Sequence, residues 1–228
     1  MKQIISMFAI VSLLAMGGYM FFEPSLAGAA GGPGAGPYSD SITATQDVTS
    51  ELSITAAPDV IMSGAILGIT GNAGNPRTGS TTWTVITSNT TGFNLTMVSN
   101  ASTSPAMRLD STWNFSDYSP VTAGTPDYAW SSPASSQAEF GYTVEPATAA
   151  DTIAKFKDDG TICGTGVGNT ANSCWYNVST TAETIINRTS DTSVTGEIEK
   201  VKFNTESNAK YLKEGAYVAD ITVTATQN

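Results

Sequence analysis

Residues 42–55 read ITATQDVTSELSIT, and this stretch decides the fold class. Its odd positions are all polar, whereas its even positions hold every apolar residue, among them Ile42, Val48 and Leu52. A period of two is typical of an extended strand with one buried face. Fourteen residues exceed the usual strand of about 5–6 residues, so we expect a strand that bends or crosses between two sheets.

The same alternation recurs along the chain. Thr81–Ser88 and residues 93–97 alternate on either side of a Gly-containing loop, which predicts a hairpin. Residues 199–203 form another alternating run, and residues 217–225 form the last one. Several short strands with turn signals between them favour an all-β fold, and we expect an Ig-like antiparallel β-sandwich.

Helical patterns are scarce. Only Thr148–Phe156 and Asn208–Leu212 are short helix candidates, and charged residues make up 13% of the chain. The middle, from about Ser111 to Asn187, is rich in Ser, Pro, Gly and aromatic residues. We therefore expect long irregular loops in the middle of the chain, which decorate one sandwich domain.

Charge and composition exclude several function classes. The net charge is −10, and such an acidic chain repels phosphate backbones, so we expect no nucleic-acid partner. The sequence contains no His, which excludes Ser-His-Asp catalysis, Cys-His catalysis and His-ligated metal sites in this chain. We accordingly expect a non-catalytic protein without a cofactor or metal.

The N-terminus has the pattern of a secretory signal. Lys2 precedes an apolar run over Ile4–Phe22, and Ser25 and Ala27 place small residues at the −3 and −1 positions of a cleavage site. This predicts a signal peptide over residues 1–27 and a secreted or cell-surface protein. The alternative is an uncleaved anchor, in which case the signal is the only contact with a membrane. Residues 28–39 are rich in Gly, Ala and Pro and predict a linker, and residues 40–228 form the domain.

Cys163 and Cys174 are the two cysteines of the chain, and a small polar segment separates them. In a secreted chain such a pair predicts a disulfide. The alternative is a redox or metal site, but the spacing is not that of a C-x-x-C motif.

Aromatic residues of the middle region are candidates for ligand binding. Trp113, Tyr118, Tyr128 and Trp130 could form a platform on which sugar rings stack, which would make the chain an extracellular carbohydrate-binding module. The alternative is that they fill the core and cover loops, as Trp and Tyr often do.

Several acidic residues also deserve a functional interpretation. Asp117, Asp127, Glu139 and Glu145 lie near aromatic residues, and glycoside hydrolysis needs two carboxylates placed about 5–10 Å apart. The Asp158–Gly160 triplet suggests either calcium or an ordinary turn, and the EF-hand pattern is absent. We interpret both sets as structural.

The segment before the last strand contains a further fold signal. Leu212-Lys-Glu-Gly215-Ala-Tyr217 has the spacing of a tyrosine corner, in which a Tyr hydroxyl bonds to upstream backbone.

These patterns together resemble secreted bacterial surface proteins built on one Ig-like sandwich. The resemblance rests on the long first strand, Trp83-Thr-Val85, the turn Asn89-Thr-Thr-Gly92-Phe93, and Gly215-Ala-Tyr217 ahead of the last strand. The groups that the chain is similar to are WxL-type cell-wall proteins and TasA/camelysin-type fibre subunits. The resemblance implies a structural role as a fibre, surface-layer or adhesive component. The implied partners are further copies of the chain, or cell-wall and surface glycans.

Such a protein could polymerise through its first strand. The strand over residues 42–55 follows a flexible linker, so it can pair within its own sandwich or add to a sheet edge of a neighbour. Pairing within its own domain is the ordinary expectation, because sequential elements usually pair locally.

Overall fold

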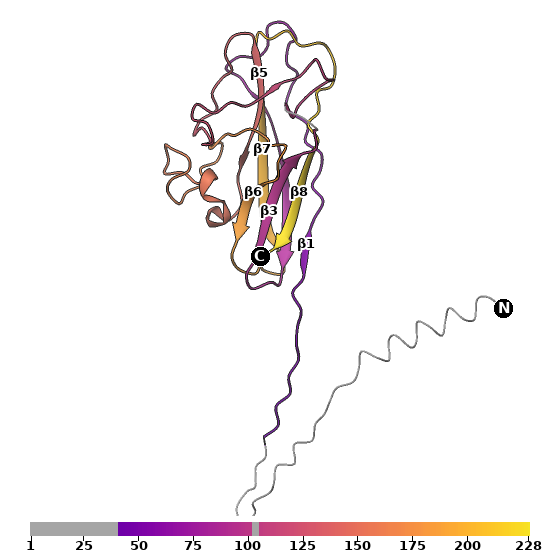
Figure 1. Ribbon diagram of the computed structural model, residues 1–228, viewed down its shortest axis with the longest axis vertical. Coiled ribbons are helices and arrows are strands. Elements are labelled where there is room, and N and C mark those ends of the chain that lie inside the picture. Colours follow the sequence, from indigo (N-terminus) through magenta and orange to yellow (C-terminus); the bar gives the residue numbers. More distant parts are fainter. Residues whose placement is uncertain (1–40, 102–104) are drawn as a thin grey trace, which may run out of the picture. The chain divides into compact units, whose positions relative to one another are not determined.

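The computed structural model describes residues 41–101 and 105–228. Two β-sheets lie face to face in it, and the sequence expectation of an all-β, sandwich-like fold is confirmed (Figure 1). Both sheets belong to the unit Asp47–Asn228. The predicted signal peptide and linker fall outside the described residues. In the described part of the chain, no helix combines the length and apolar character that crossing a bilayer requires.

The larger sheet has five strands in the order β1-β2-β7-β5-β4. They are β1 (Leu52–Ile54), β2 (Arg77–Thr87), β7 (Glu197–Asn208), β5 (Gln137–Val144) and β4 (Ser116–Asp117). Neighbouring strands are antiparallel, except that the two-residue β4 runs parallel to β5. The smaller sheet has the order β6-β3-β8, with β6 (Glu183–Arg188), β3 (Phe93–Ser99) and β8 (Ile221–Gln227), and is antiparallel throughout.

The core lies between the sheets, where each strand contributes one face. Burial alternates strictly along β3, with Phe93, Leu95 and Met97 inward. From the opposite sheet, Phe140 of β5 and Phe203 of β7 stack with their ring centroids 5.6 Å apart. The period-two pattern therefore identifies the inward residues, because successive side chains of a strand point to opposite faces.

The first strand is shorter than its sequence pattern predicts. Only Leu52–Ile54 is a strand, and residues 41–50 lie outside any strand. Leu52 is paired with Thr87, the last residue of β2. The residues before Leu52 thus run past the end of their partner, so alternation alone cannot make them a strand of this sheet.

The predicted hairpin between β2 and β3 is wrong. The two strands lie in different sheets, and residues 88–92 form an arch between the sheets. Asn89 closes this arch, because its carbonyl accepts from the Gly92 N–H at 2.9 Å and its side-chain amide donates to the Gly92 carbonyl at 3.0 Å. Both strands still bury one face in the same core, which is why their sequence patterns look like those of paired strands.

The helix expectations are met only in part. Thr148–Phe156 holds two single 3₁₀ turns, η1 (Ala149–Asp151) and η2 (Ala154–Phe156). Asn208–Leu212 is not helical, because Asn208 ends β7 and the following residues continue as irregular chain. The middle of the chain is irregular as predicted, although it contains the eight-residue, well-buried β5, which lies between β7 and β4.

The expected tyrosine hydrogen bond is present. The Tyr217 hydroxyl donates to the Lys213 carbonyl at 3.0 Å, four residues upstream, as the spacing before the last strand predicts.

Candidate functional site

Cys163 and Cys174 form the predicted disulfide, and both are buried. The loop that they enclose is also held by Asp158, which is 2% exposed. Its carboxylate accepts from the Thr170 N–H at 2.6 Å, the Thr170 hydroxyl at 2.8 Å and the Gly160 N–H at 2.9 Å. The Asp158–Gly160 triplet therefore forms an ordinary turn, which the Asp158 carboxylate stabilises by accepting hydrogen bonds. In 41–101 and 105–228, no group of three or more ligating side chains is arranged to hold a metal ion.

Two of the predicted platform residues lie together. The Tyr118 and Trp130 rings stack with centroids 4.5 Å apart, and Trp130 meets Trp175 edge to face at 5.3 Å. Tyr118 is only 2% exposed. The Trp130 indole N–H donates to the Glu206 carboxylate at 2.7 Å. These rings cover the outer face of β5 and β7, and their polar atoms already have protein partners.

The other two platform residues lie in different surroundings. Trp113 meets Tyr211 edge to face at 5.4 Å. Tyr128 is partly buried and packs against the core. The ring contacts thus join Tyr118 to Trp130 and Trp113 to Tyr211, whereas the sequence pattern grouped Trp113 with Tyr118.

The candidate acids are committed to structural contacts. The Tyr118 hydroxyl donates to Asp127 at 2.7 Å, and the Ala106 N–H donates to Asp117 at 2.8 Å. Glu145 pairs with Lys200 at 2.6 Å. Glu139 lies opposite Glu206 in the β5–β7 register. Burial raises the pKa of Glu139, and the charges of Glu206 and Asp127 raise it further.

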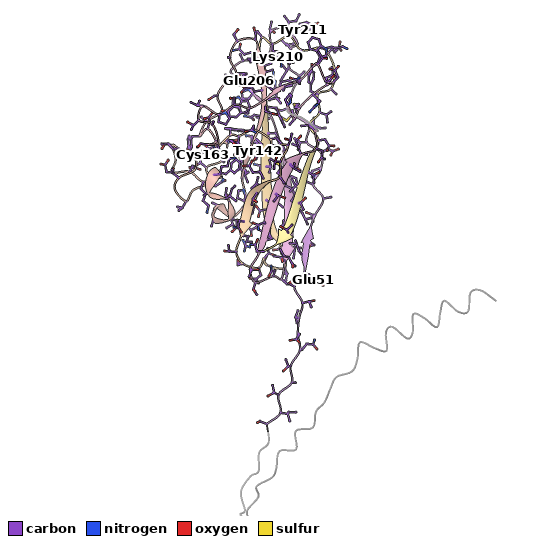
Figure 2. All side chains as sticks on the ribbon, in the orientation of Figure 1. Glu51, Tyr142, Cys163, Glu206, Lys210 and Tyr211 are labelled. Carbon is purple, nitrogen blue, oxygen red and sulfur yellow. A yellow bond between two sulfur atoms is a disulfide. The ribbon has the colours of Figure 1, made fainter. Side chains whose placement is uncertain are left out.

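An apolar groove of about 550 Å³ lies beside Tyr211, at the end of the two-sheet unit opposite Glu51 (Figure 2). Its apolar lining includes Met62, Ile66, Phe115, Leu212 and Tyr217. Loops supply most of this lining, so the groove offers no free strand edge.

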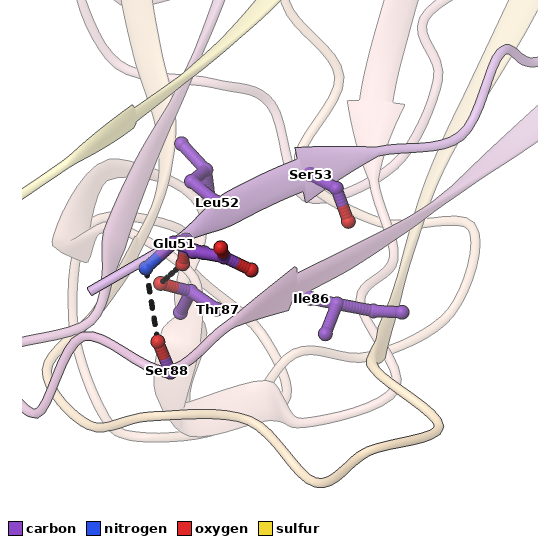
Figure 3. A pocket seen from close by; sticks show the side chains of 6 residues that line it. All are labelled: Glu51, Leu52, Ser53, Ile86, Thr87 and Ser88. Atoms are coloured by element: carbon purple, nitrogen blue, oxygen red, sulfur yellow. Dashed lines mark hydrogen bonds between the residues drawn. The ribbon is translucent and has the colours of Figure 1, made fainter. Parts of the chain in front are cut away.

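A hollow of about 450 Å³ lies where β1 meets the end of β2 (Figure 3). The Glu51 N–H donates to the Ser88 hydroxyl at 2.9 Å, and the Thr87 hydroxyl donates to the Glu51 carbonyl at 2.8 Å. Side-chain hydrogen bonds thus continue the pairing just beyond the three-residue β1. The hollow marks where the N-terminal segment leaves the sheet.

The segment of residues 41–50, called here the N-terminal segment, is exposed at every position. Ile42 is 92% exposed and Val48 is 88% exposed. Isolated exposed apolar residues are ordinary on protein surfaces. Here, however, they occupy one face of an alternating pattern, which is the pattern of a strand that can bury that face.

The smaller sheet ends in an exposed edge. β8 pairs with β3 on one side, and within residues 41–101 and 105–228 no strand is hydrogen-bonded to its other side, where β1 of the larger sheet lies nearby. Its core-facing residues Ile221, Val223 and Ala225 are only partly buried although they pack against the core. An edge of this kind is a template for another strand.

One buried acidic residue, Glu199, was not predicted from the sequence. Glu199 is 1% exposed, and neither of its carboxylate oxygens has a hydrogen-bond partner. It follows the inward positions of β7 with Val201 and Phe203. The alternation of residues 199–203 is visible in the sequence. It places a Glu on the same face as Val201 and Phe203, and this could have identified Glu199 as a buried acid.

No family model, curated protein or solved structure matches this chain.

Proposed function

We propose that this protein is a secreted, non-catalytic structural component of a cell surface, which assembles with copies of itself into fibres or layers. The observation that carries the proposal is the N-terminal segment, which is alternating in sequence, exposed at every position and outside any strand.

Strand addition explains what such a segment can do. An extended segment that joins a sheet edge gains main-chain hydrogen bonds, and its alternate side chains enter pockets. Ile42, Ala44 and Val48 would supply those side chains, since they share one face of the pattern. Because donor and acceptor are different surfaces, the contact is head-to-tail, and a head-to-tail contact that does not close grows into a filament.

Two further features support a surface role. The disulfide between Cys163 and Cys174 suits an oxidising, extracellular environment. The resemblance to WxL-type and TasA/camelysin-type proteins points to the same class. A carbohydrate-binding module is the competing function, but the Trp130 indole N–H already donates a hydrogen bond to Glu206 within the protein.

The test compares the chain that begins at Gly28 with a variant that lacks residues 28–48. The first should form filaments or large oligomers in electron micrographs and light scattering. The truncation should remain a folded monomer, because both sheets lie beyond residue 48. Circular dichroism and thermal unfolding check that it is folded.

Two outcomes would contradict the proposal. If the chain that begins at Gly28 stays monomeric at all concentrations, homopolymeric assembly is wrong. If it binds glycans on an array, and Trp130→Ala abolishes that binding, the carbohydrate-binding function is favoured instead.

A further inference from the structure

Residues 148–156, called here the strap, contain both 3₁₀ turns and are held by side chains at each end. The Thr148 hydroxyl donates to the carboxylate of Glu197, which belongs to β7. At the other end, Lys155 forms an ion pair with Glu183 of β6. Each turn contains only three residues, too few to be stable alone. The strap therefore depends on its side-chain contacts with β6 and β7.

The middle of the strap is held by one ion pair. Arg188, the last residue of β6, donates to the Asp151 carboxylate at 2.7 Å, and both side chains are largely buried. The same guanidinium lies 3.4 Å from the Glu197 carboxylate. Next to this pair, the Ile153 N–H donates to the Ile185 carbonyl over 3.4 Å, which is a long hydrogen bond. Arg188 thus links the strap to the ends of β6 and β7.

A second carboxylate lies on the same face of β7 and has no partner. Glu199 is two residues beyond Glu197, so their side chains leave the same face of the strand about 7 Å apart. Glu199 is 1% exposed, and neither of its oxygens accepts a hydrogen bond. Its register partner on β2 is Trp83, which is uncharged. Within the described residues, the charges that act on Glu199 are those of Asp151, Glu197 and Arg188.

The protonation state of Glu199 decides how Arg188 is shared. A neutral Glu199 needs no counter-charge, so Arg188 remains with Asp151. An ionised Glu199 at this depth does need one, and Arg188 is the cation that acts on it. The docked strap also leaves the Thr152 hydroxyl buried without a partner, a cost that favours release once the pair between Arg188 and Asp151 is broken.

We propose that Glu199 is a proton-controlled latch for the strap: when it is protonated, Arg188 stays on Asp151 and the strap is docked, and when it is ionised, Arg188 pairs with Glu199 instead and the strap is released. This inference does not depend on assembly. The docked state holds a proton on Glu199 that the released state gives up. Rising pH therefore favours release, and acidification restores the docked strap.

Hydrogen exchange of the chain that begins at Gly28 tests the latch between pH 5.5 and pH 8.5. After correction for the intrinsic exchange rate, protection of the Ile153 amide should fall by a factor of about ten or more over this range, because the folded pKa of Glu199 is about 8 and each pH unit below it is worth tenfold. The Tyr142 amide in β5, which donates to the Tyr176 carbonyl at 2.9 Å, reports unfolding of the core. It should remain better protected than Ile153 at every pH.

Three variants separate the parts of the latch. Glu199→Gln keeps the shape of the protonated side chain, so its Ile153 protection should not change with pH. Glu139→Gln is the matched control, since burial also raises the pKa of Glu139 but this residue lies outside the cluster, and it should retain the wild-type response. Asp151→Asn removes the carboxylate that Arg188 holds, so the strap should be poorly protected at every pH.

Three results would overturn the latch. If Ile153 and Tyr142 are equally protected at each pH, the strap opens only when the whole protein unfolds. If Ile153 protection is independent of pH in the wild type, no latch operates in this range. If Glu199→Gln keeps the pH dependence of the wild type, another group controls the strap.

Discussion

At the residue scale, Glu199 is a buried carboxyl group whose two oxygens have no hydrogen-bond partner. The pKa of Glu199 is raised to about 8, first by burial and then by the charges of Asp151 and Glu197, whereas the Arg188 charge opposes this rise. Arg188 is itself shared, because it bonds Asp151 at 2.7 Å and approaches Glu197 at 3.4 Å. A carboxyl group without a partner among these charges is most stable when protonated.

Glu199→Gln should therefore stabilise the protein at alkaline pH. Between the unfolded pKa near 4.5 and the folded pKa of about 8, the folded state holds a proton that the unfolded state releases. The free energy of unfolding consequently falls as pH rises through this window and levels off above it. The variant should remove this fall and exceed the wild type by a few kcal/mol at pH 8, with little difference near pH 4, as urea unfolding can measure.

Glu145→Gln is the control with the opposite sign. Burial acts to raise the pKa of Glu145, but hydrogen bonds from Lys200 and the Asn172 N–H, together with the Lys200 charge, leave it lowered. Its stabilisation is present at neutral pH and lost on acidification, so removing this carboxylate should destabilise the protein at pH 7. Equal pH profiles for wild type and Glu199→Gln would show that Glu199 is ionised in the folded protein.

At the element scale, the arch of residues 88–92 decides how β2 and β3 are placed. Gly92 has a φ of +85°, and a Cβ there would lie 2.1 Å from the Arg188 carbonyl oxygen. The arch thus needs Gly both for its backbone conformation and for the close approach of the chain after β6.

Gly92→Ala should lower the free energy of unfolding by more than the cost of a left-handed backbone conformation, because the added Cβ also clashes with Arg188. Gly74→Ala is the matched control, because Gly74 has a φ of +73° and nothing within 4 Å of a built Cβ. The control should cost about 1–2 kcal/mol from the left-handed backbone, and Gly92→Ala should cost clearly more in the same thermal unfolding experiment. If the two variants lose the same stability, the arch can move to accommodate the Cβ without disturbing β6.

At the scale of the whole molecule, the expected route of export makes a prediction about the mature chain. Lys2, the apolar run and Ser25-Leu26-Ala27 predict cleavage after Ala27. N-terminal sequencing of native protein should find Gly28, and the intact mass should decrease by the mass of residues 1–27 and of the two hydrogen atoms lost when the disulfide forms. An intact Met1 on a cytoplasmic protein with two free thiols would contradict both expectations.

The sequence by itself determined the features that depend on local pattern. Period-two alternation identified β7 and β8 and their inward faces, because the side-chain period of a strand needs no knowledge of its partner. Two cysteines around a small polar loop identified the disulfide. The spacing from Leu212 to Tyr217 predicted that the Tyr hydroxyl bonds to upstream backbone, and the structure identifies the acceptor as the Lys213 carbonyl.

Only the tertiary structure decided the features that depend on which strand or residue lies opposite another in the fold. β1 begins only at Leu52 because its partner β2 ends at Thr87, and β2 and β3 lie in facing sheets because the arch crosses between the sheets. Trp130 bonds Glu206, 76 residues away in the chain, a contact that no local pattern contains. The open edge of β8 belongs to the same class. Alternation shows that a segment can pair, whereas only the arrangement of all strands shows which edges remain unpaired.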